Sequence, residues 1–106
     1  MQEATFLILT ALAGGRQHGY GIICEVAAIS AGRVRLRAGT LYSALDRLRL
    51  DGLVEVDGEE IVDSRLRRYY RLTPKGARQL AAEAARLHSD AATALARLGV
   101  VGGTAP

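Results

Sequence analysis

The order in which helical and strand-like apolar patterns follow one another constrains the fold of this chain more than any other feature. Apolar residues recur at helical spacing in three segments, at about 3–13, 19–29 and 38–51. Two later segments, 53–57 and 66–72, alternate apolar and polar residues as the strands of a β-hairpin do. Thr73 and Pro74 then provide an N-cap and a first helical residue, and a last helix is expected to run to about Leu98.

This order predicts a mainly α fold with a small β-hairpin wing (α+β), arranged as a winged helix-turn-helix followed by a long C-terminal helix. A chain of 106 residues suffices for one domain with a thin core. We expect the winged helix-turn-helix over residues 1–73, a dimerisation helix over 74–98 and a flexible tail over 99–106. The third helix would then be the recognition helix and the hairpin the wing.

Three local expectations concern the region between the first and third helices. Residues 16–18 are expected to be a polar connection, and the alternation of Arg with Val and Leu over 33–37 predicts a short strand. In the second helix, one face is predicted to combine Tyr20, Ile23, Val26 and Ala27. The single cysteine, Cys24, lies in an apolar stretch and is interpreted as a small buried side chain.

The distribution of charge says more about function than the net charge of +3. Basic blocks at 33–49 and 63–71 flank an acidic block at 51–60, and all but one of the 14 basic residues are arginines. Arginine suits bidentate contact with phosphate and guanine. A surface on which the acidic block pairs with the basic blocks would give the same pattern, so charge alone leaves both interpretations open.

The predicted positions of these blocks favour DNA binding. The first turn of a recognition helix meets base edges, and here it offers hydroxyl groups and a glycine that lets the backbone approach closely. Arginines flank that turn, and others lie on the wing, where at most one of Arg67 and Arg68 can share a face with Arg65. The predicted DNA-binding residues are Arg37, Gly39, Thr40, Tyr42, Ser43, Arg47, Arg65 and Arg68.

The last predicted helix carries a narrow stripe of Leu and Ala. A helix of about 25 residues reaches about 37 Å, which is longer than so small a domain can cover. The stripe therefore predicts pairing with the first and last helices of a second copy, in preference to folding back on its own domain. The residues assigned to this homodimer are Phe6, Leu9, Leu80, Ala84, Leu87, Ala91, Leu95 and Leu98. A two-fold dimer would require a palindromic operator in double-stranded DNA.

Several motifs stand in an order and spacing found in one known family. They are His18-Gly19-Tyr20, Gly39-Thr40-Leu41-Tyr42, Gly52-Leu53-Val54 and Arg68-Tyr69-Tyr70-Arg71-Leu72-Thr73, together with Leu48, Arg65, Gly76 and Leu80. Over about residues 5–80 the chain resembles the PadR family of transcriptional regulators, in a compact form with one C-terminal helix. Ser43 departs from the pattern, because the family usually has Pro there.

The resemblance implies a homodimeric DNA-binding repressor that is often released from DNA by a small molecule. It also implies that Tyr42, Ser43, Arg65 and Arg68 contact DNA, and that His18 and Tyr20 are structural and could also contact a phosphate. A dimer joined through the last helix could enclose a cavity lined by Phe6, Leu9, Leu87 and Ala91. Such a cavity would suit a small apolar or aromatic effector.

Other classes of function find less support in the sequence. Neither a metal-ligand spacing nor a phosphate-binding glycine loop nor a Gly-x-Ser-x-Gly motif is present, so we expect neither an enzyme nor a cofactor. The absence of a long apolar run and of a basic N-terminal segment predicts a cytoplasmic protein without a membrane span. The main alternative is a winged helix that docks proteins without binding DNA, but the arginines on its binding face favour DNA.

Overall fold

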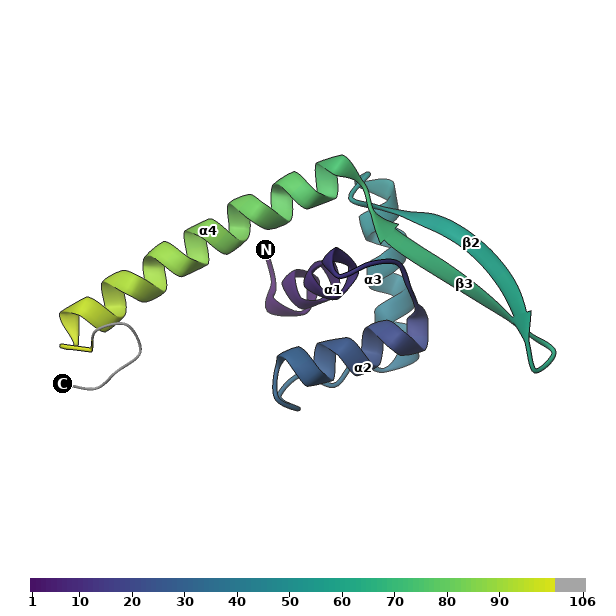
Figure 1. Ribbon diagram of the computed structural model, residues 1–106, viewed down its shortest axis with the longest axis horizontal. Coiled ribbons are helices and arrows are strands. Elements are labelled where there is room, and N and C mark those ends of the chain that lie inside the picture. The colour runs from purple at the N-terminus through teal and green to yellow at the C-terminus, as the bar shows by residue number, and fades with distance from the viewer. Residues whose placement is uncertain (101–106) are drawn as a thin grey trace.

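The computed structural model describes residues 1–100 and has the predicted winged helix-turn-helix architecture with a long C-terminal helix (Figure 1). Three strands form an antiparallel sheet in the order β1-β3-β2. The elements are α1 Glu3–Ala13, β1 Gln17–His18, α2 Gly19–Ile29, α3 Ala38–Leu50, β2 Val54–Val62, β3 Arg65–Leu72 and α4 Pro74–Arg97. The helices found at 3–13, 19–29 and 38–50 agree with the sequence prediction to within a residue.

Helix α1 lies at the centre of the hydrophobic core. It contacts α2, α4 and β3, which explains why its sequence is apolar on nearly every side. Its Ile8 and Leu9 are almost fully buried, and Ile22 of α2, Leu45 of α3 and Tyr70 of β3 belong to the same core cluster. Helix α3 packs against this core with one side, and its other side is exposed.

Side chains next to the helix starts fix where α2 and α4 begin. The ring of His18 accepts a hydrogen bond from the backbone N–H of Gly21 at its Nδ1 atom (3.1 Å), and Thr73 caps α4 by accepting from Gly76 N–H (3.0 Å). The Thr73 hydroxyl also donates to the carbonyl oxygen of Gly52 (2.6 Å), which ties the start of α4 to the end of α3. This bond joins the residue that follows β3 to the residues that precede β2, at the base of the wing.

The strand predicted over 33–37 is absent, and the sheet takes its third strand from 17–18. Ser30 explains the first difference, because its hydroxyl accepts from the Val34 N–H (3.0 Å) and donates to the Val26 carbonyl (2.8 Å). These bonds hold the segment as a loop, although Val34 still packs against the core as expected. The supposed polar connection at 16–18 instead pairs with β3 at Tyr69 and Tyr70.

Two expectations about α2 were also wrong. Tyr20 is 70% exposed and Cys24 is exposed, whereas the other residues of the predicted face, Ile23, Val26 and Ala27, are buried or half-buried. The cysteine is therefore not a buried side chain. The two errors arose because almost every residue of α2 is apolar or small, so helical periodicity alone did not set the limits of its inward face.

The wing is longer than the alternation in the sequence indicated. Strand β2 continues to Val62, across an irregularity in its register between Val56 and Glu59 that interrupts the period-two pattern. Asp63 and Ser64 form the tip with positive φ angles of 52° and 62°. Such angles at both central residues match the twist of a tight two-residue hairpin.

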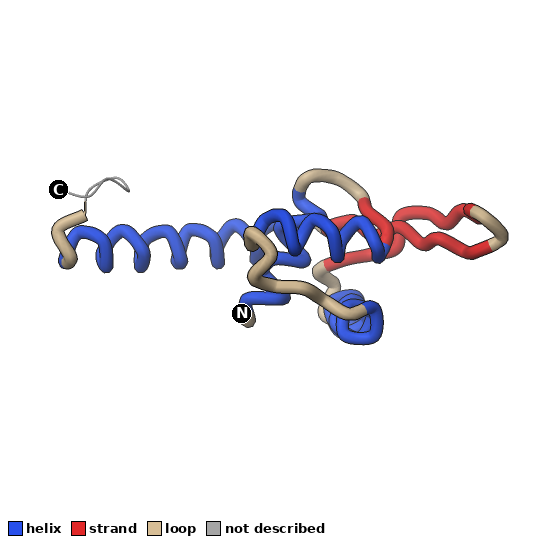
Figure 2. The backbone as a smooth tube through the Cα atoms, turned by 90° about the horizontal axis from the view of Figure 1, so that it is seen from below, coloured by secondary structure: helices blue, strands red, loops and turns tan. Residues whose placement is uncertain are grey.

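Helix α4 projects from the domain on the side away from the wing (Figures 1 and 2). The chain measures 56 × 27 × 20 Å, and its radius of gyration is 16.0 Å, against about 13 Å for a compact chain of this size. Within residues 1–100, no helix combines the length and the apolar character that a membrane crossing requires. The tail predicted over 99–106 lies, from residue 101 onward, outside the described residues.

Gly76 provides a test of how α4 docks. A Cβ at this buried position would overlap the backbone carbonyl of Leu53, which cannot move as a flexible side chain would. We expect Gly76→Ala to lower the free energy of unfolding by about 1–3 kcal/mol, measured by urea denaturation. Gly39→Ala is the matched control, because nothing lies within 4 Å of a Cβ there and helix propensity favours Ala. Equal stability of the two variants would contradict this account.

Candidate nucleic-acid interface

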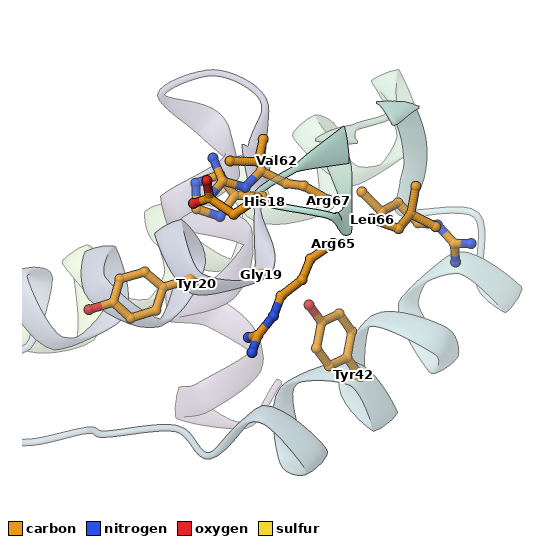
Figure 3. Close-up of a pocket in the computed structure, with 10 residues that line it drawn as sticks. His18, Gly19, Tyr20, Tyr42, Val62, Arg65, Leu66 and Arg67 are labelled. Carbon is orange, nitrogen blue, oxygen red and sulfur yellow. The ribbon is translucent and has the colours of Figure 1, made fainter. Parts of the chain in front are cut away.

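A cleft of about 550 Å³ separates the wing from the starts of α2 and α3 (Figure 3). One wall comes from α2 and α3, and the other from β3 and the end of β2. The residues that line it are His18, Gly19, Tyr20, Tyr42, Val62, Asp63, Arg65, Leu66, Arg67 and Arg68. Three of the predicted DNA-binding residues, Tyr42, Arg65 and Arg68, therefore meet in one place.

Tyr42 is held in this cleft by a close approach to α2. Its hydroxyl lies where a Cβ of Gly19 would stand, so a side chain larger than hydrogen at Gly19 would displace the ring. The Tyr42 side chain nevertheless remains 45% exposed. The structure therefore places Tyr42 at the surface, with its ring against Gly19 of α2.

The other predicted residues of α3 face a different hollow. Gly39, Thr40, Ser43 and Arg47 line a concavity of about 580 Å³ between α3 and the first half of α1. All four are exposed, and Arg37 is exposed just before the helix begins. The recognition helix thus presents hydroxyl groups on two sides of its first turns, with no side-chain cap on its N-terminus.

The acidic block of β2 neutralises only part of the basic block of β3. Arg68 pairs with Glu59 (3.1 Å), and Arg71 pairs with Glu55 (2.7 Å) across the hairpin. Cross-strand register explains this selection, because Glu59 stands opposite Arg68 and Glu55 opposite Arg71. The interpretation as paired surface charges therefore holds for Arg68 and Arg71.

Arg65 and Arg67 have no carboxylate within 4.0 Å among residues 1–100. Arg65 extends from the wing into the space between Tyr20 and Tyr42 (Figure 3). Arg67 is half-buried near His18, and its positive charge adds to the effect of burial in lowering the pKa of that histidine, which the Glu60 carboxylate opposes. Arg67 and Tyr20 line the cleft although neither is among the predicted DNA-binding residues. The sequence signal for Arg67 is its position between Arg65 and Arg68, and that for Tyr20 is the motif His18-Gly19-Tyr20.

Two aromatic contacts fix the base of the wing beside the cleft. The rings of His18 and Tyr69 meet edge to face with centroids 5.6 Å apart. The guanidinium of Arg16 lies 4.3 Å from the centre of the Tyr69 ring and donates to the carbonyl oxygen of Asp57 (2.9 Å). These contacts join β1 to both wing strands, so the start of α2 and the wing hold a common orientation.

The residues predicted for dimerisation fall into three groups. Leu9 is completely buried in its own chain and presents no surface to a second copy. Phe6 and Leu80 are half-buried against the core. The remaining residues, Ala84, Leu87, Ala91, Leu95 and Leu98, are exposed along the part of α4 that projects from the domain.

One protein family matches most of this chain. The model of the transcriptional regulator PadR-like family matches residues 8–82, which is well over half of the sequence. The chain belongs to the PadR-like family of transcriptional regulators. This family is one of regulators and not of enzymes.

Relatives of this PadR-like regulator agree with that assignment. The transcriptional regulator Rv3488 of Mycobacterium tuberculosis is 42% identical over 69 residues, which are 65% of this chain and 61% of that protein. The chain thus matches less than two thirds of the relative's length. A PadR family transcriptional regulator from Eggerthella lenta is 26% identical, with a TM-score of 0.67 over 87% of this chain and 80% of that one.

A further solved structure shows the same fold in a complex. Bacillus subtilis PadR, crystallised with operator DNA, is 21% identical to this PadR-like regulator. Its TM-score is 0.65, over 74% of this chain and 45% of that chain. At this level of identity the likeness establishes the fold alone.

The N-cap of α2 predicts a pH dependence of stability. His18 must be neutral to accept the Gly21 hydrogen bond at Nδ1, and burial together with Arg67 lowers its pKa. In the unfolded chain the ring takes up a proton near its ordinary pKa of about 6.5. The stabilisation is therefore complete above about pH 6.5, and it is lost as the pH falls through the lowered pKa of the folded state.

We expect the urea midpoint of the wild type to fall between pH 7.5 and pH 5.5 by more than that of His18→Asn. Asn caps helices well and does not titrate, so this variant retains a cap while it removes the ring. The effect should not exceed about 1 kcal/mol, the typical contribution of an N-cap. His88→Asn, which changes the exposed histidine of α4, serves as the control. Parallel pH curves for wild type and His18→Asn would contradict the role assigned to the ring.

Proposed function

We propose that this chain is a homodimeric, sequence-specific DNA-binding repressor that acts on palindromic operators and is released by a small-molecule effector. The observation that supports DNA binding most directly is the cleft between wing and recognition helix. There the guanidinium of Arg65, which pairs with no carboxylate among residues 1–100, extends beside the exposed side chain of Tyr42. An arginine without a carboxylate partner, beside a helix N-terminus that no side chain caps, is a suitable site for a DNA phosphate.

In this proposal α3 enters the major groove with its first turns toward the bases. Thr40, Tyr42 and Ser43 supply hydroxyls, and the open space around Gly39 leaves room for the DNA to approach. Arg37, just before α3, and Arg47, in its last turn, contact the DNA backbone. Arg65 and Arg67 of the wing contact the adjacent backbone, and Arg68 contributes less because Glu59 holds it.

The homodimer would form through α4. Beyond Glu83, the side chains of this helix are exposed for the rest of its length within the described residues, and they include the apolar stripe Leu87, Ala91 and Leu95. An apolar stripe of this kind on a helix that extends past its own domain is suited to pairing with another helix. A two-fold axis through α4 would set two recognition helices about one turn of DNA apart, or about 34 Å.

An effector would bind between the two copies. Leu87 and Ala91 are exposed on α4 and Phe6 is half-buried beside it, so a second copy could close an apolar cavity over these residues. Such a cavity would accept a small apolar or aromatic molecule, whose binding alters the spacing of the recognition helices. A repressor of this kind acts where the chromosome is, which is the cytoplasm in a bacterial cell.

Selection from random duplexes, followed by a gel shift in the presence of random competitor DNA, tests the proposed function. We expect the full chain to select inverted repeats whose half-sites lie about 10 base pairs apart. Arg65→Ala should weaken binding to all sequences alike and reduce the salt dependence of log K by about one unit per protomer.

Arg68→Ala is the matched control for the wing arginines. Its guanidinium already pairs with Glu59, so its removal should alter the salt dependence less than that of Arg65. Selection of no common sequence, with equal binding to any duplex, would overturn the operator proposal and favour a docking module. A larger effect at Arg68 than at Arg65 would overturn the assignment of the two arginines.

Replacement of Leu87 by Arg tests the dimer. A charge in the middle of the apolar stripe should separate the copies, so sedimentation should find monomers where the wild type gives dimers. Ser89→Arg adds the same charge to an exposed position off the stripe and should leave the dimer intact. If Leu87→Arg sediments as a dimer, α4 is not the principal interface.

A further inference from the structure

We propose that the tip of the wing packs an apolar pair, Ile61 and Leu66, against the sugar walls of the DNA minor groove. This inference rests on the proposed function, because it requires that the chain bind duplex DNA. It adds an apolar contact to the wing, for which the sequence motifs predict contacts by arginines alone. The pair takes no part in the hydrophobic core, the ion pairs or the apolar stripe of α4, and Leu66 but not Ile61 is among the residues that line the cleft.

The two side chains form one surface. Ile61 and Leu66 are register partners across the hairpin, so their side chains leave the sheet on the same face. Ile61 is 77% exposed and Leu66 is 60% exposed. On the same face, the neighbouring pair Glu59 and Arg68 is charged, so the apolar character is confined to the end of the hairpin.

An exposed apolar pair on a projecting hairpin is unfavourable unless something covers it. Isolated apolar side chains at the surface are ordinary, but paired ones on a hairpin favour aggregation. The core of this chain does not reach the tip, which Figure 1 shows at the end of the hairpin, away from the helices. Helix α4 projects to the opposite side, so a dimer formed through α4 would leave both tips free.

The charges beside the pair identify DNA as its occupant. Arg65 and Arg67 leave β3 on the face opposite Leu66, and neither is neutralised by a carboxylate among residues 1–100. A minor groove is about 6 Å wide, so a hairpin that enters it touches both walls. One face of the wing then brings arginines to the phosphates of one strand, and the other brings Ile61 and Leu66 to the deoxyriboses of the other. Apolar side chains of this size are used in the minor groove by other DNA-binding proteins.

The experiment compares salt titrations and hydroxyl-radical footprints on a duplex obtained by the selection described above. The double variant Ile61→Thr/Leu66→Thr keeps β-forming residues at the tip but removes its apolar surface. We expect its affinity to fall about tenfold with an unchanged salt slope, because an apolar contact releases no counterions. Protection of sugars beneath the wing should be lost, whereas protection beneath the recognition helix should remain.

Two further variants separate contact from folding. The apolar exchange Ile61→Leu/Leu66→Ile alters the same hairpin positions and should retain wild-type affinity and footprint. Leu50→Gln removes an apolar side chain that is 89% exposed at the end of α3, and it should bind as the wild type does. Thermal unfolding of all variants checks that the hairpin still forms.

The outcomes distinguish this inference from the function on which it rests. If the wild type selects and protects a duplex but the Thr double variant binds it equally well, the apolar pair does not contact DNA and the tip is free for a protein partner. If the apolar exchange loses as much affinity as the Thr variant, the effect belongs to the shape of the hairpin and the inference also fails. If the wild type protects no sequence at all, the operator proposal itself fails.

Discussion

Burial of α1 is the interaction on which the rest of the structure depends. This helix contacts α2, α4 and β3, so the recognition unit, the wing and the projecting helix are all packed on a common support. Its Leu9 has no exposed surface, and loss of so buried a Leu side chain typically costs about 2–5 kcal/mol. Because one helix supports all three parts, the orientation of α4 relative to the wing is set inside a single chain before any second copy binds.

The charges of the two wing strands determine which part of the wing surface stays positive. These strands carry complementary charges, but the register satisfies only the arginines that stand opposite acidic residues. Exposed pairs of this kind contribute little to stability, generally less than about 1 kcal/mol each. Their more important effect is on the charge of the wing surface. Carboxylates neutralise Arg68 and Arg71, whereas the positive charges of Arg65 and Arg67 remain beside the cleft.

Sequence periodicity was sufficient to predict the helices and the hairpin, because each follows a pattern within one element. Of the predicted DNA-binding residues, Tyr42, Arg65 and Arg68 are brought together in the cleft. Periodicity failed where the deciding interaction joins distant residues. The pairing of Gln17 with Tyr70 made a strand from a segment with no strand pattern, and the Ser30 hydroxyl kept Val34 in a loop despite a favourable alternation. The exposure of Cys24 had no local signal, because it depends on which side of α2 meets α1.

The short strand β1 also explains why the cleft has a fixed shape. Its two residues pair with β3 and so hold the start of α2 against the sheet. The next residue, Gly19, is in close contact with the hydroxyl of Tyr42 from α3. The start of α2, strand β3 and helix α3, which are far apart in the sequence, therefore meet around His18 and Gly19. A displacement of the wing would be transmitted through His18 and Gly19 to Tyr42, so the spacing between the wing and the recognition helix is constrained by packing and does not depend on the flexibility of a loop.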